Sequence, residues 1–270
     1  MTGWVWYSGT LLEADRVAIP VTSLSLTQGL GAYETLRLVG GRAPLLSRHL
    51  QRLAATCAQM GLEGASQDWE KALAALSRVC GIPDARARIT IGDGFQLATC
   101  DPLPSELASE RREGIALWTS TATPARAELK SVSRFGLLDA ERAAGGEVLL
   151  VSPAGAWLET SRASVFAWID DALWTACPPQ VLPGIARAGL LEVARAEGID
   201  MVHAPPSPSP APDTELPELF TTNAVRGLRP VRSLNGQPLP IRERTRRLQK
   251  LLDQWMGLGE SVPPSPGASI

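Results

Sequence analysis

The sequence has few of the residues that build metal centres and disulfide frameworks. Its 270 residues include four cysteines and two histidines, His49 and His203, and no two cysteines form a Cys-x-x-Cys pair. We therefore expect no metal site and no disulfide framework. Free thiols are typical of the reducing cytoplasm, where we expect this protein to work.

Long apolar runs and an excess of one charge are also missing. No stretch of about 18 apolar residues could span a bilayer, and the first residues lack the basic and apolar pattern of a signal peptide. The net charge is −2, which gives no electrostatic reason to expect binding to nucleic acid or to an anionic membrane. With 44% hydrophobic and 20% charged residues, the composition is that of a globular protein.

The apolar residues that are present alternate between strand-like and helix-like spacing. Leu46, Leu50, Leu53 and Cys57 recur at helical spacing before Gly61, a typical helix end. Residues 85–91 instead alternate apolar and polar, as in a half-buried strand. The same reasoning predicts a second helix after Ser66 that ends at Gly81, and helices at about 134–144, 183–197 and 241–255. It predicts strands at 4–12 (a hairpin), 33–39, 115–119, 148–151, 164–169, 173–175 and 218–222.

A small, polar, proline-containing stretch divides the chain. We interpret residues 121–128 as a linker between an N-terminal α+β domain, 1–120, and a larger C-terminal α+β domain, 129–258. Ala204–Pro212 is rich in proline and predicts a surface loop. Residues 259–270 are expected to form a disordered tail.

Lysine is scarce, and one of the three lysines has an unusual context. Lys71 and Lys250 fall on predicted amphipathic helices, whereas Lys130 lies just past the linker beside apolar residues. Taken alone, Lys130 would be interpreted as a surface lysine. However, it is followed in order by segments 157–166, 181–187 and 220–231, and preceded by segments 31–37 and 49–53.

This ordered series resembles the class IV (fold type IV) pyridoxal-phosphate enzymes. The segments read WLETSRASVF, VLPGIAR, FTTNAVRGLRPV, GAYETLR and HLQRL. The resemblance covers nearly the whole chain. It implies a two-domain α+β fold like that of D-amino-acid aminotransferase, with the cofactor in the interdomain cleft and a homodimeric assembly.

The resemblance assigns roles to two residues at the centre of the chemistry. Lys130 matches the lysine that holds pyridoxal 5′-phosphate as an imine, and such an amine must be able to lose its proton. Glu159 matches the glutamate that faces the pyridine nitrogen, where a carboxylate keeps that nitrogen protonated and the ring electron-accepting.

The phosphate would be held by a cation and by backbone amides. Arg52 matches the arginine of the family's His-x-x-Arg-Leu motif, Ile185 and Ala186 open a helix whose N–H groups favour an anion, and Asn223-Ala224 matches a second amide-bearing turn. Ala186 and Ala224 replace hydroxyl residues that many relatives have, so those two hydroxyl contacts would be missing. His49 is expected to be structural.

Several reactions are compatible with such a site. The compact length, the Asn223-Ala224 pair and the absence of an Arg-x-His pair favour 4-amino-4-deoxychorismate lyase, which forms 4-aminobenzoate for folate biosynthesis. Thr35 would then lie near the substrate. An amino-acid transaminase, branched-chain or D-specific, is the alternative, and a non-catalytic relative is a third hypothesis. A substrate with carboxylates needs arginines, and the candidates are Arg37, Arg88 and Arg226.

Overall fold

The computed structural model describes residues 3–64, 67–206 and 217–258. Its first half is a five-stranded antiparallel sheet in the order β2-β1-β5-β4-β3. The strands are β1 (Trp4–Tyr7), β2 (Thr10–Glu13), β3 (Gly31–Leu38), β4 (Ala85–Gly92) and β5 (Phe95–Pro102). The 3₁₀ helix η1 (Ala14–Arg16) and the short α1 (Leu24–Thr27) connect β2 to β3.

Two amphipathic helices, α2 (Leu46–Met60) and α3 (Trp69–Cys80), cover one face of this sheet. Leu53 and Cys57 of α2 are buried against it, as their spacing predicts. Both helices end at a left-handed glycine, Gly61 and Gly81, which confirms the predicted helix ends. In β4, the apolar positions are buried and the arginines point away from the core, so the other sheet face is left for polar residues.

The second half contains a nine-stranded sheet. Its strands are β6 (Ile115–Ser120), β7 (Val148–Val151), β8 (Trp157–Thr160), β9 (Ser164–Ile169), β10 (Ala172–Trp174), β11 (Met201–Val202), β12 (Glu218–Asn223), β13 (Gly227–Leu234) and β14 (Gln237–Pro238). Because β8 pairs with both β7 and β9, six of these strands form a closed ring. Glu159 pairs with Ser164 where the ring closes.

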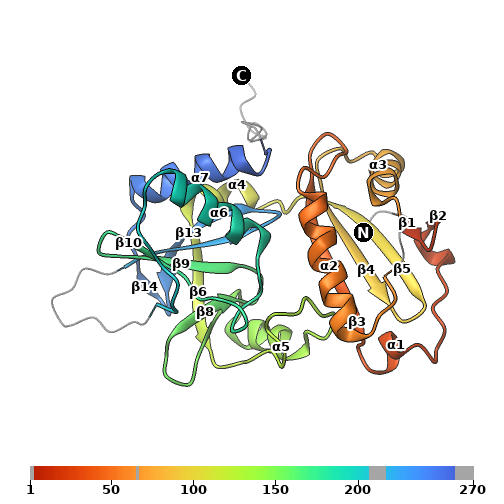
Figure 1. The fold of residues 1–270 in the computed structure, drawn as a ribbon, viewed down its shortest axis with the longest axis horizontal. Helices are drawn as coiled ribbons and strands as arrows, with labels where there is room; N and C mark the ends of the chain where they lie inside the picture. The colour runs from red at the N-terminus through yellow and green to blue at the C-terminus, as the bar shows by residue number, and fades with distance from the viewer. Residues whose placement is uncertain (1–2, 65–66, 207–216, 259–270) are drawn as a thin grey trace.

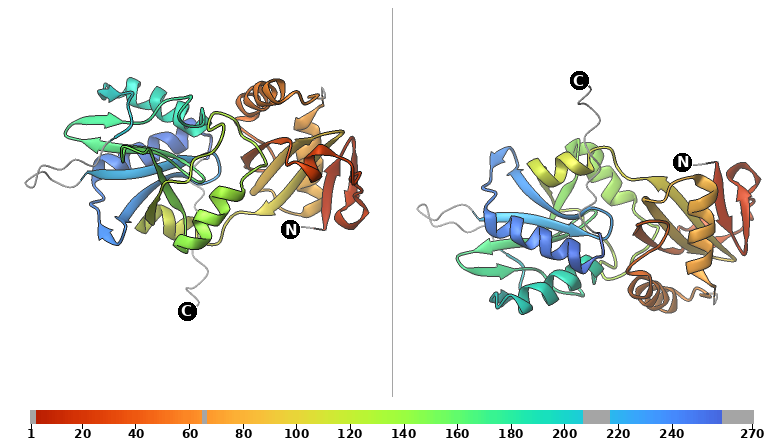
Figure 2. Two further views of the ribbon diagram at one scale, coloured as in Figure 1. Left: turned by 90° about the horizontal axis from the view of Figure 1, so that it is seen from below. Right: turned by 90° about the horizontal axis from the view of Figure 1, so that it is seen from above.

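Four helices accompany this sheet: α4 (Leu107–Glu113), α5 (Phe135–Ala144), α6 (Ile185–Ala196) and α7 (Glu243–Trp255). Helices α6 and α7 pack on each other, and they contact β12 and β13. Figures 1 and 2 show the two sheets side by side, and Figure 2 shows α2 and α5 on opposite sides of the molecule near their junction.

The division of the chain differs from the predicted boundary at residue 120. Strand β6 lies inside the predicted first domain, but it pairs with β13 and β7 of the second sheet. Its Ile115 and Leu117 are buried in the second half's core. The assignment of this strand to the first domain is therefore corrected, and we propose that the domain boundary lies between β5 and α4. A strand's own residues do not show which distant strand it pairs with.

Some expectations fall on residues outside the described ranges. Ser66, the expected cap of α3, is one of these, and Asp68 caps the helix by accepting a hydrogen bond from the Lys71 N–H. Most of the proline-rich segment 204–212 and all of the tail 259–270 also lie outside them. Within the described ranges, none of the helices is long and apolar enough to cross a membrane.

Candidate active site

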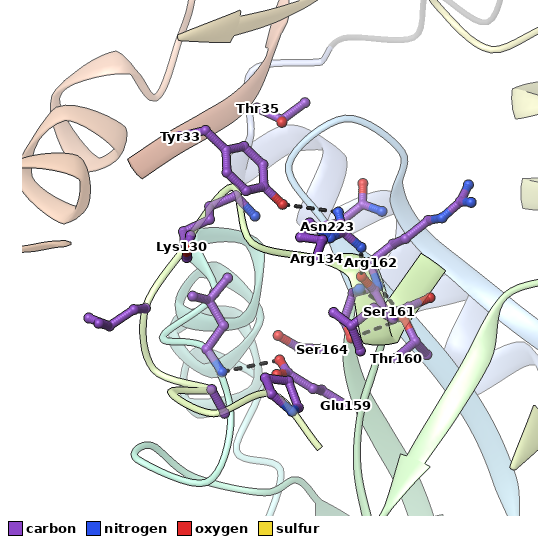
Figure 3. Close-up of a pocket in the computed structure, with 18 of the residues that line it drawn as sticks. Tyr33, Thr35, Lys130, Arg134, Glu159, Thr160, Ser161, Arg162, Ser164 and Asn223 are labelled. Carbon is purple, nitrogen blue, oxygen red and sulfur yellow. Dashed lines mark hydrogen bonds between the residues drawn. The ribbon is translucent and has the colours of Figure 1, made fainter. Parts of the chain in front are cut away.

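A cavity of about 940 Å³ lies between the two halves of the chain. Residues from β3, α2, β4 and β5 line one part of it, and residues from the second half line the rest. Figure 3 shows Tyr33 and Lys130 on one side of this pocket and Glu159 and Ser164 on another. Of the residues proposed from the sequence, the pocket lining includes Thr35, Arg52, Arg88, Lys130, Glu159, Ile185, Ala186, Asn223, Ala224 and Arg226.

Lys130 is held in the pocket by backbone pairing with β3. The Tyr33 N–H donates to the Lys130 carbonyl at 2.9 Å, and the Val132 N–H donates to the Gly31 carbonyl at 2.9 Å. A Cβ on Gly31 would lie 3.0 Å from a Val132 methyl group. The glycine therefore allows the lysine segment to lie directly against the strand, which ties the second half's lysine to the first half's sheet.

The surroundings of Lys130 favour its neutral form. Burial lowers the pKa of Lys130, and the positive charges of Arg52 and Arg134 lower it further, whereas Tyr33 and Glu34 oppose the shift. The side-chain nitrogen lies 4.8 Å from the centre of the Tyr33 ring. A neutral amine is the form that can bond to an aldehyde or accept a proton.

Glu159 comes from the closing strand of the ring of strands and is buried. Burial raises the pKa of Glu159 to about 7, against the opposing effects of the Leu182 N–H, Lys130 and Arg52. The Leu182 N–H donates to its carboxylate at 3.1 Å. The carboxyl group thus has few partners for a negative charge, and a cation placed beside it would be strongly favoured.

Arg52 belongs to a buried network on the first half's side of the pocket. Its Nε and Nη2 both donate to Glu34 at 2.7 Å, and its Nη1 donates to the Pro183 carbonyl at 2.9 Å. His49 lies 2.8 Å from the same carboxylate through Nδ1, which agrees with the structural role expected for this histidine. The network fixes the arginine side chain against the segment that leads into α6.

Helix α6 begins at the pocket, as predicted. Gly184 is its N-cap and has no side chain that could bond the first N–H groups. A Cβ on Gly184 would lie 2.6 Å from the Ser164 hydroxyl and 3.2 Å from Cβ of Arg187. The free N–H groups of Ile185 and Ala186, with the helix dipole, make this end of the pocket suitable for an anion.

The turn at Asn223-Ala224 also lines the pocket. The Asn223 side-chain oxygen accepts hydrogen bonds from the N–H groups of Val225 and Arg226, so the amide side chain shapes the turn. Arg226 is paired with Glu110 at 2.9 Å. Its charge is therefore already balanced by a neighbour from α4.

Arg37 is not brought to the pocket. It lines a separate small cavity together with His49 and Leu45, and burial lowers the pKa of its guanidinium. Thr35 and Arg88 do reach the pocket from neighbouring strands, in register with each other. Residue type alone did not distinguish Arg37 from Arg88, because both are arginines on sheet strands.

Tyr33 and Arg134 are among the pocket residues that sequence reasoning did not propose. The Arg134 Nη1 donates to the Tyr33 hydroxyl at 3.0 Å, and its Nη2 donates to the Ser161 carbonyl. Burial raises the pKa of Tyr33, but the charges of Lys130, Arg134 and Arg88 together lower it below its ordinary value. The position of Arg134, shortly after the lysine in the sequence, was the available signal.

The family model described as amino-transferase class IV matches residues 31–234, and this match includes every element that lines the pocket. The chain belongs to this family. Class IV aminotransferases depend on pyridoxal phosphate, so this is the cofactor of the protein. The fold is accordingly that of the type IV pyridoxal-phosphate enzymes.

Individual relatives agree with the family assignment. The chain is 28% identical over 229 residues to the bifunctional aminodeoxychorismate lyase / D-amino acid transaminase of Mycobacterium tuberculosis, covering 73% of this chain and 79% of that protein. A hypothetical aminotransferase from the same organism, solved in an alpha-ketoglutarate and PMP bound form, is 25% identical and superposes with a TM-score of 0.83 over 94% of this chain and 98% of its own. The 4-amino-4-deoxychorismate lyase of Pseudomonas aeruginosa has the same fold, with a TM-score of 0.78, 24% identity and coverage of 93% and 98%.

The residues of the pocket fit the family's cofactor. Lys130 and Glu159 both line the pocket, where the lysine would supply an amine for the aldehyde and the glutamate a carboxyl group for the pyridine nitrogen. A side chain at Gly184, where α6 begins, would collide with the Ser164 hydroxyl, so the backbone can lie close to the pocket there. Among the described residues, no group of three or more histidine, cysteine or acidic side chains is arranged to hold a metal ion.

Proposed function

We propose that this class IV enzyme is a lyase that converts 4-amino-4-deoxychorismate to 4-aminobenzoate and pyruvate, a step towards folate. The observation that carries the proposal is that Lys130 and Glu159 line one pocket that also contains several arginines. The bifunctional relative, whose name includes this lyase activity, supports the same assignment. The substrate has two carboxylates, and such groups are bound by guanidinium side chains.

The chain's own residues can perform the proton transfers of this reaction. When bound, pyridoxal phosphate supplies an electron sink for the substrate's amino-bearing carbon. Lys130 takes the proton from that ring carbon, the bond to the enolpyruvyl oxygen breaks, and the ring becomes aromatic. The departing enolate is protonated to pyruvate. Glu159 would hold a proton at the cofactor's pyridine nitrogen, and Arg52 with the start of α6 would hold the phosphate.

A D-amino-acid transaminase is the second candidate, because the bifunctional relative carries that activity in its name as well. The two reactions would begin with the same proton removal by Lys130. The lyase then expels a leaving group, whereas the transaminase returns a proton at another carbon. Arg86 and Arg88 stand in the strand where D-amino-acid transaminases have an Arg-x-His pair. This difference favours the lyase.

The two candidates are separated by one assay. The cofactor-loaded protein is given chorismate, glutamine and a partner aminodeoxychorismate synthase, and the formation of 4-aminobenzoate is measured. A parallel panel of D-alanine, L-valine and L-glutamate is tested for conversion of the cofactor to its amine form. Formation of 4-aminobenzoate that depends on this protein supports the lyase. Conversion of the cofactor to its amine form, without any 4-aminobenzoate, rejects the lyase in favour of the transaminase.

We further propose that the protein is a homodimer. Phe135 is 75% exposed and Leu138 is 43% exposed on α5 at the rim of the pocket, and Leu26 of α1 is 63% exposed. These two regions are close, since a Cβ on Gly29 would lie 3.6 Å from Ser133. A second copy would cover this apolar surface. Sedimentation should give twice the chain mass, and Phe135→Asp should shift it towards the monomer; a wild-type monomer would reject the proposal.

We also propose a cytoplasmic location. Cys57 and Cys177 are free thiols, and free thiols are maintained in the reducing cytoplasm.

A further inference from the structure

Two guanidinium groups, those of Arg88 and Arg134, and the Lys130 amine converge on Tyr33 in the pocket. The Arg88 guanidinium carbon lies 3.8 Å from the centre of the Tyr33 ring, and the Lys130 nitrogen lies 4.8 Å from it. Arg134 donates to the hydroxyl of the same ring at 3.0 Å, as Figure 3 shows. The Tyr33 phenol cannot balance the charges of two guanidinium groups. The cluster therefore favours the binding of anions.

The other arginines of the pocket already have carboxylate partners. The pairs are Arg52 with Glu34, Arg86 with Asp101, Arg126 with Glu128, Arg162 with Glu141, and Arg226 with Glu110. In the part of the chain that the structure describes, Arg88 and Arg134 form no such pair. Their hydrogen bonds go to neutral oxygens: the Thr90 hydroxyl for Arg88, and the Tyr33 hydroxyl and Ser161 carbonyl for Arg134.

We propose that Arg88 and Arg134 form a subsite for two carboxylates, and that Arg134 determines the preference of this enzyme for dicarboxylate over monocarboxylate substrates. This inference rests on the proposed function for the substrate class and adds the residue that would select it. The Tyr33 ring separates the two guanidinium groups, so each can bind its own carboxylate.

Arg134 is held in place before any ligand binds. Its two hydrogen bonds go to β3 in the first half and to the segment after β8 in the second half, so it bridges the pocket. A guanidinium has five N–H donors, and these bonds use two of them. The remaining donors can bind a carboxylate, with little loss of side-chain freedom because the group is already fixed.

The experiment compares two probe ligands that differ by one carboxylate. Binding of glutarate and of butyrate to the cofactor-loaded protein is measured by calorimetry for wild type, Arg134→Gln and Arg134→Lys. The control is Arg126→Gln, which removes a pocket-rim arginine that Glu128 already neutralises. Tyr33→Phe keeps the ring beneath Arg88 but removes the hydroxyl that holds Arg134.

We expect wild type to prefer glutarate, and Arg134→Gln to weaken glutarate about tenfold or more while butyrate changes by less than about threefold. Arg134→Lys should keep part of the glutarate affinity, and Tyr33→Phe should show a smaller loss for glutarate alone. Arg126→Gln should change neither ligand. If Arg134→Gln fails to fold, Tyr33→Phe and Arg134→Lys still give the same comparison.

An equal loss for both ligands, no loss for glutarate, or no glutarate preference in wild type would overturn the inference. These results do not depend on 4-aminobenzoate formation. An enzyme that makes no 4-aminobenzoate but loses glutarate selectivity in Arg134→Gln would reject the lyase and keep the dicarboxylate subsite. If the wild-type enzyme makes 4-aminobenzoate, and the Arg134→Gln variant binds glutarate as tightly as wild type does, the lyase is kept and the dicarboxylate subsite is rejected.

Discussion

Arg52 and Glu34 are joined by two hydrogen bonds of 2.7 Å on the wall of the pocket. The Glu34 side chain is fully buried and that of Arg52 is 10% exposed. Burial alone would raise the pKa of Glu34, but the charge and hydrogen bonds of Arg52, with the hydrogen bond of His49, lower it to about 2. The pair therefore stays ionised across the physiological range and sets the direction in which Arg52 points.

Removing the Glu34 charge should disturb both the fold and the phosphate site. Glu34→Gln leaves Arg52 buried without its carboxylate, which we expect to cost about 3–5 kcal/mol of unfolding free energy. Denaturant unfolding measures this cost, and titration with pyridoxal phosphate should show weaker binding. Arg48→Gln is the matched control, because the Arg48–Glu192 pair is exposed and should contribute less than about 1 kcal/mol. Equal effects of the two substitutions would contradict the role given to Glu34.

The absence of a side chain at Gly184 should matter for cofactor binding. In Gly184→Ala, the new methyl group meets the Ser164 hydroxyl at 2.6 Å, and such overpacking typically costs about 1–3 kcal/mol. We expect the Kd for pyridoxal phosphate to rise about tenfold or more. Adding Ser164→Ala should relieve part of the loss. Gly64→Ala, where a Cβ would meet no atom within 4 Å, is the control, and a loss of the same size there would refute the explanation.

Glu159 should give the cofactor-free protein a distinctive pH dependence. Its pKa is raised to about 7 in the folded state, from an ordinary value of about 4.3. The folded state therefore binds the extra proton between these values, and stability falls as pH rises from about 4.3 to 7 and then levels off. Glu159→Gln removes this contribution.

The comparison of Glu159→Gln with wild type isolates that effect. The variant should gain up to about 4 kcal/mol relative to wild type at pH 8, and little at pH 4, because each pKa unit corresponds to about 1.4 kcal/mol. Chemical denaturation across this pH range measures the difference. A difference that does not change with pH would show that burial does not raise this pKa. Turnover by the same variant should drop at least about a hundredfold, because the pyridine nitrogen loses its acidic partner.

The sequence predicted those features that depend on local spacing. Leu46, Leu53 and Gly61 were enough to define α2, and the alternation in 85–91 was enough to define β4 and its buried face. Ten of the eleven site residues proposed from the sequence line one pocket. These residues were proposed from the order of motifs that the chain shares with the family, and not from periodicity.

Features that depend on distant contacts were not predictable in this way. The residues of strand β6 have the pattern of any half-buried strand. The strand belongs to the second sheet because it pairs with β13, more than 100 residues away in the sequence. Arg37 and Arg88 have the same chemistry, but only Arg88 stacks on Tyr33 at the pocket. Arg134 was missed because its importance follows from what lies across the cavity, namely Tyr33 and Ser161.

The most direct test of the account is to locate the lysine that bonds to the cofactor. The protein is loaded with pyridoxal phosphate, reduced with borohydride, digested, and mapped by peptide mass spectrometry. With only Lys71, Lys130 and Lys250 in the chain, the modified lysine is identified without ambiguity. We expect the label on Lys130, and none on a folded Lys130→Ala variant. A label on Lys71 or Lys250 alone, or an unlabelled wild-type protein, would contradict the central claim.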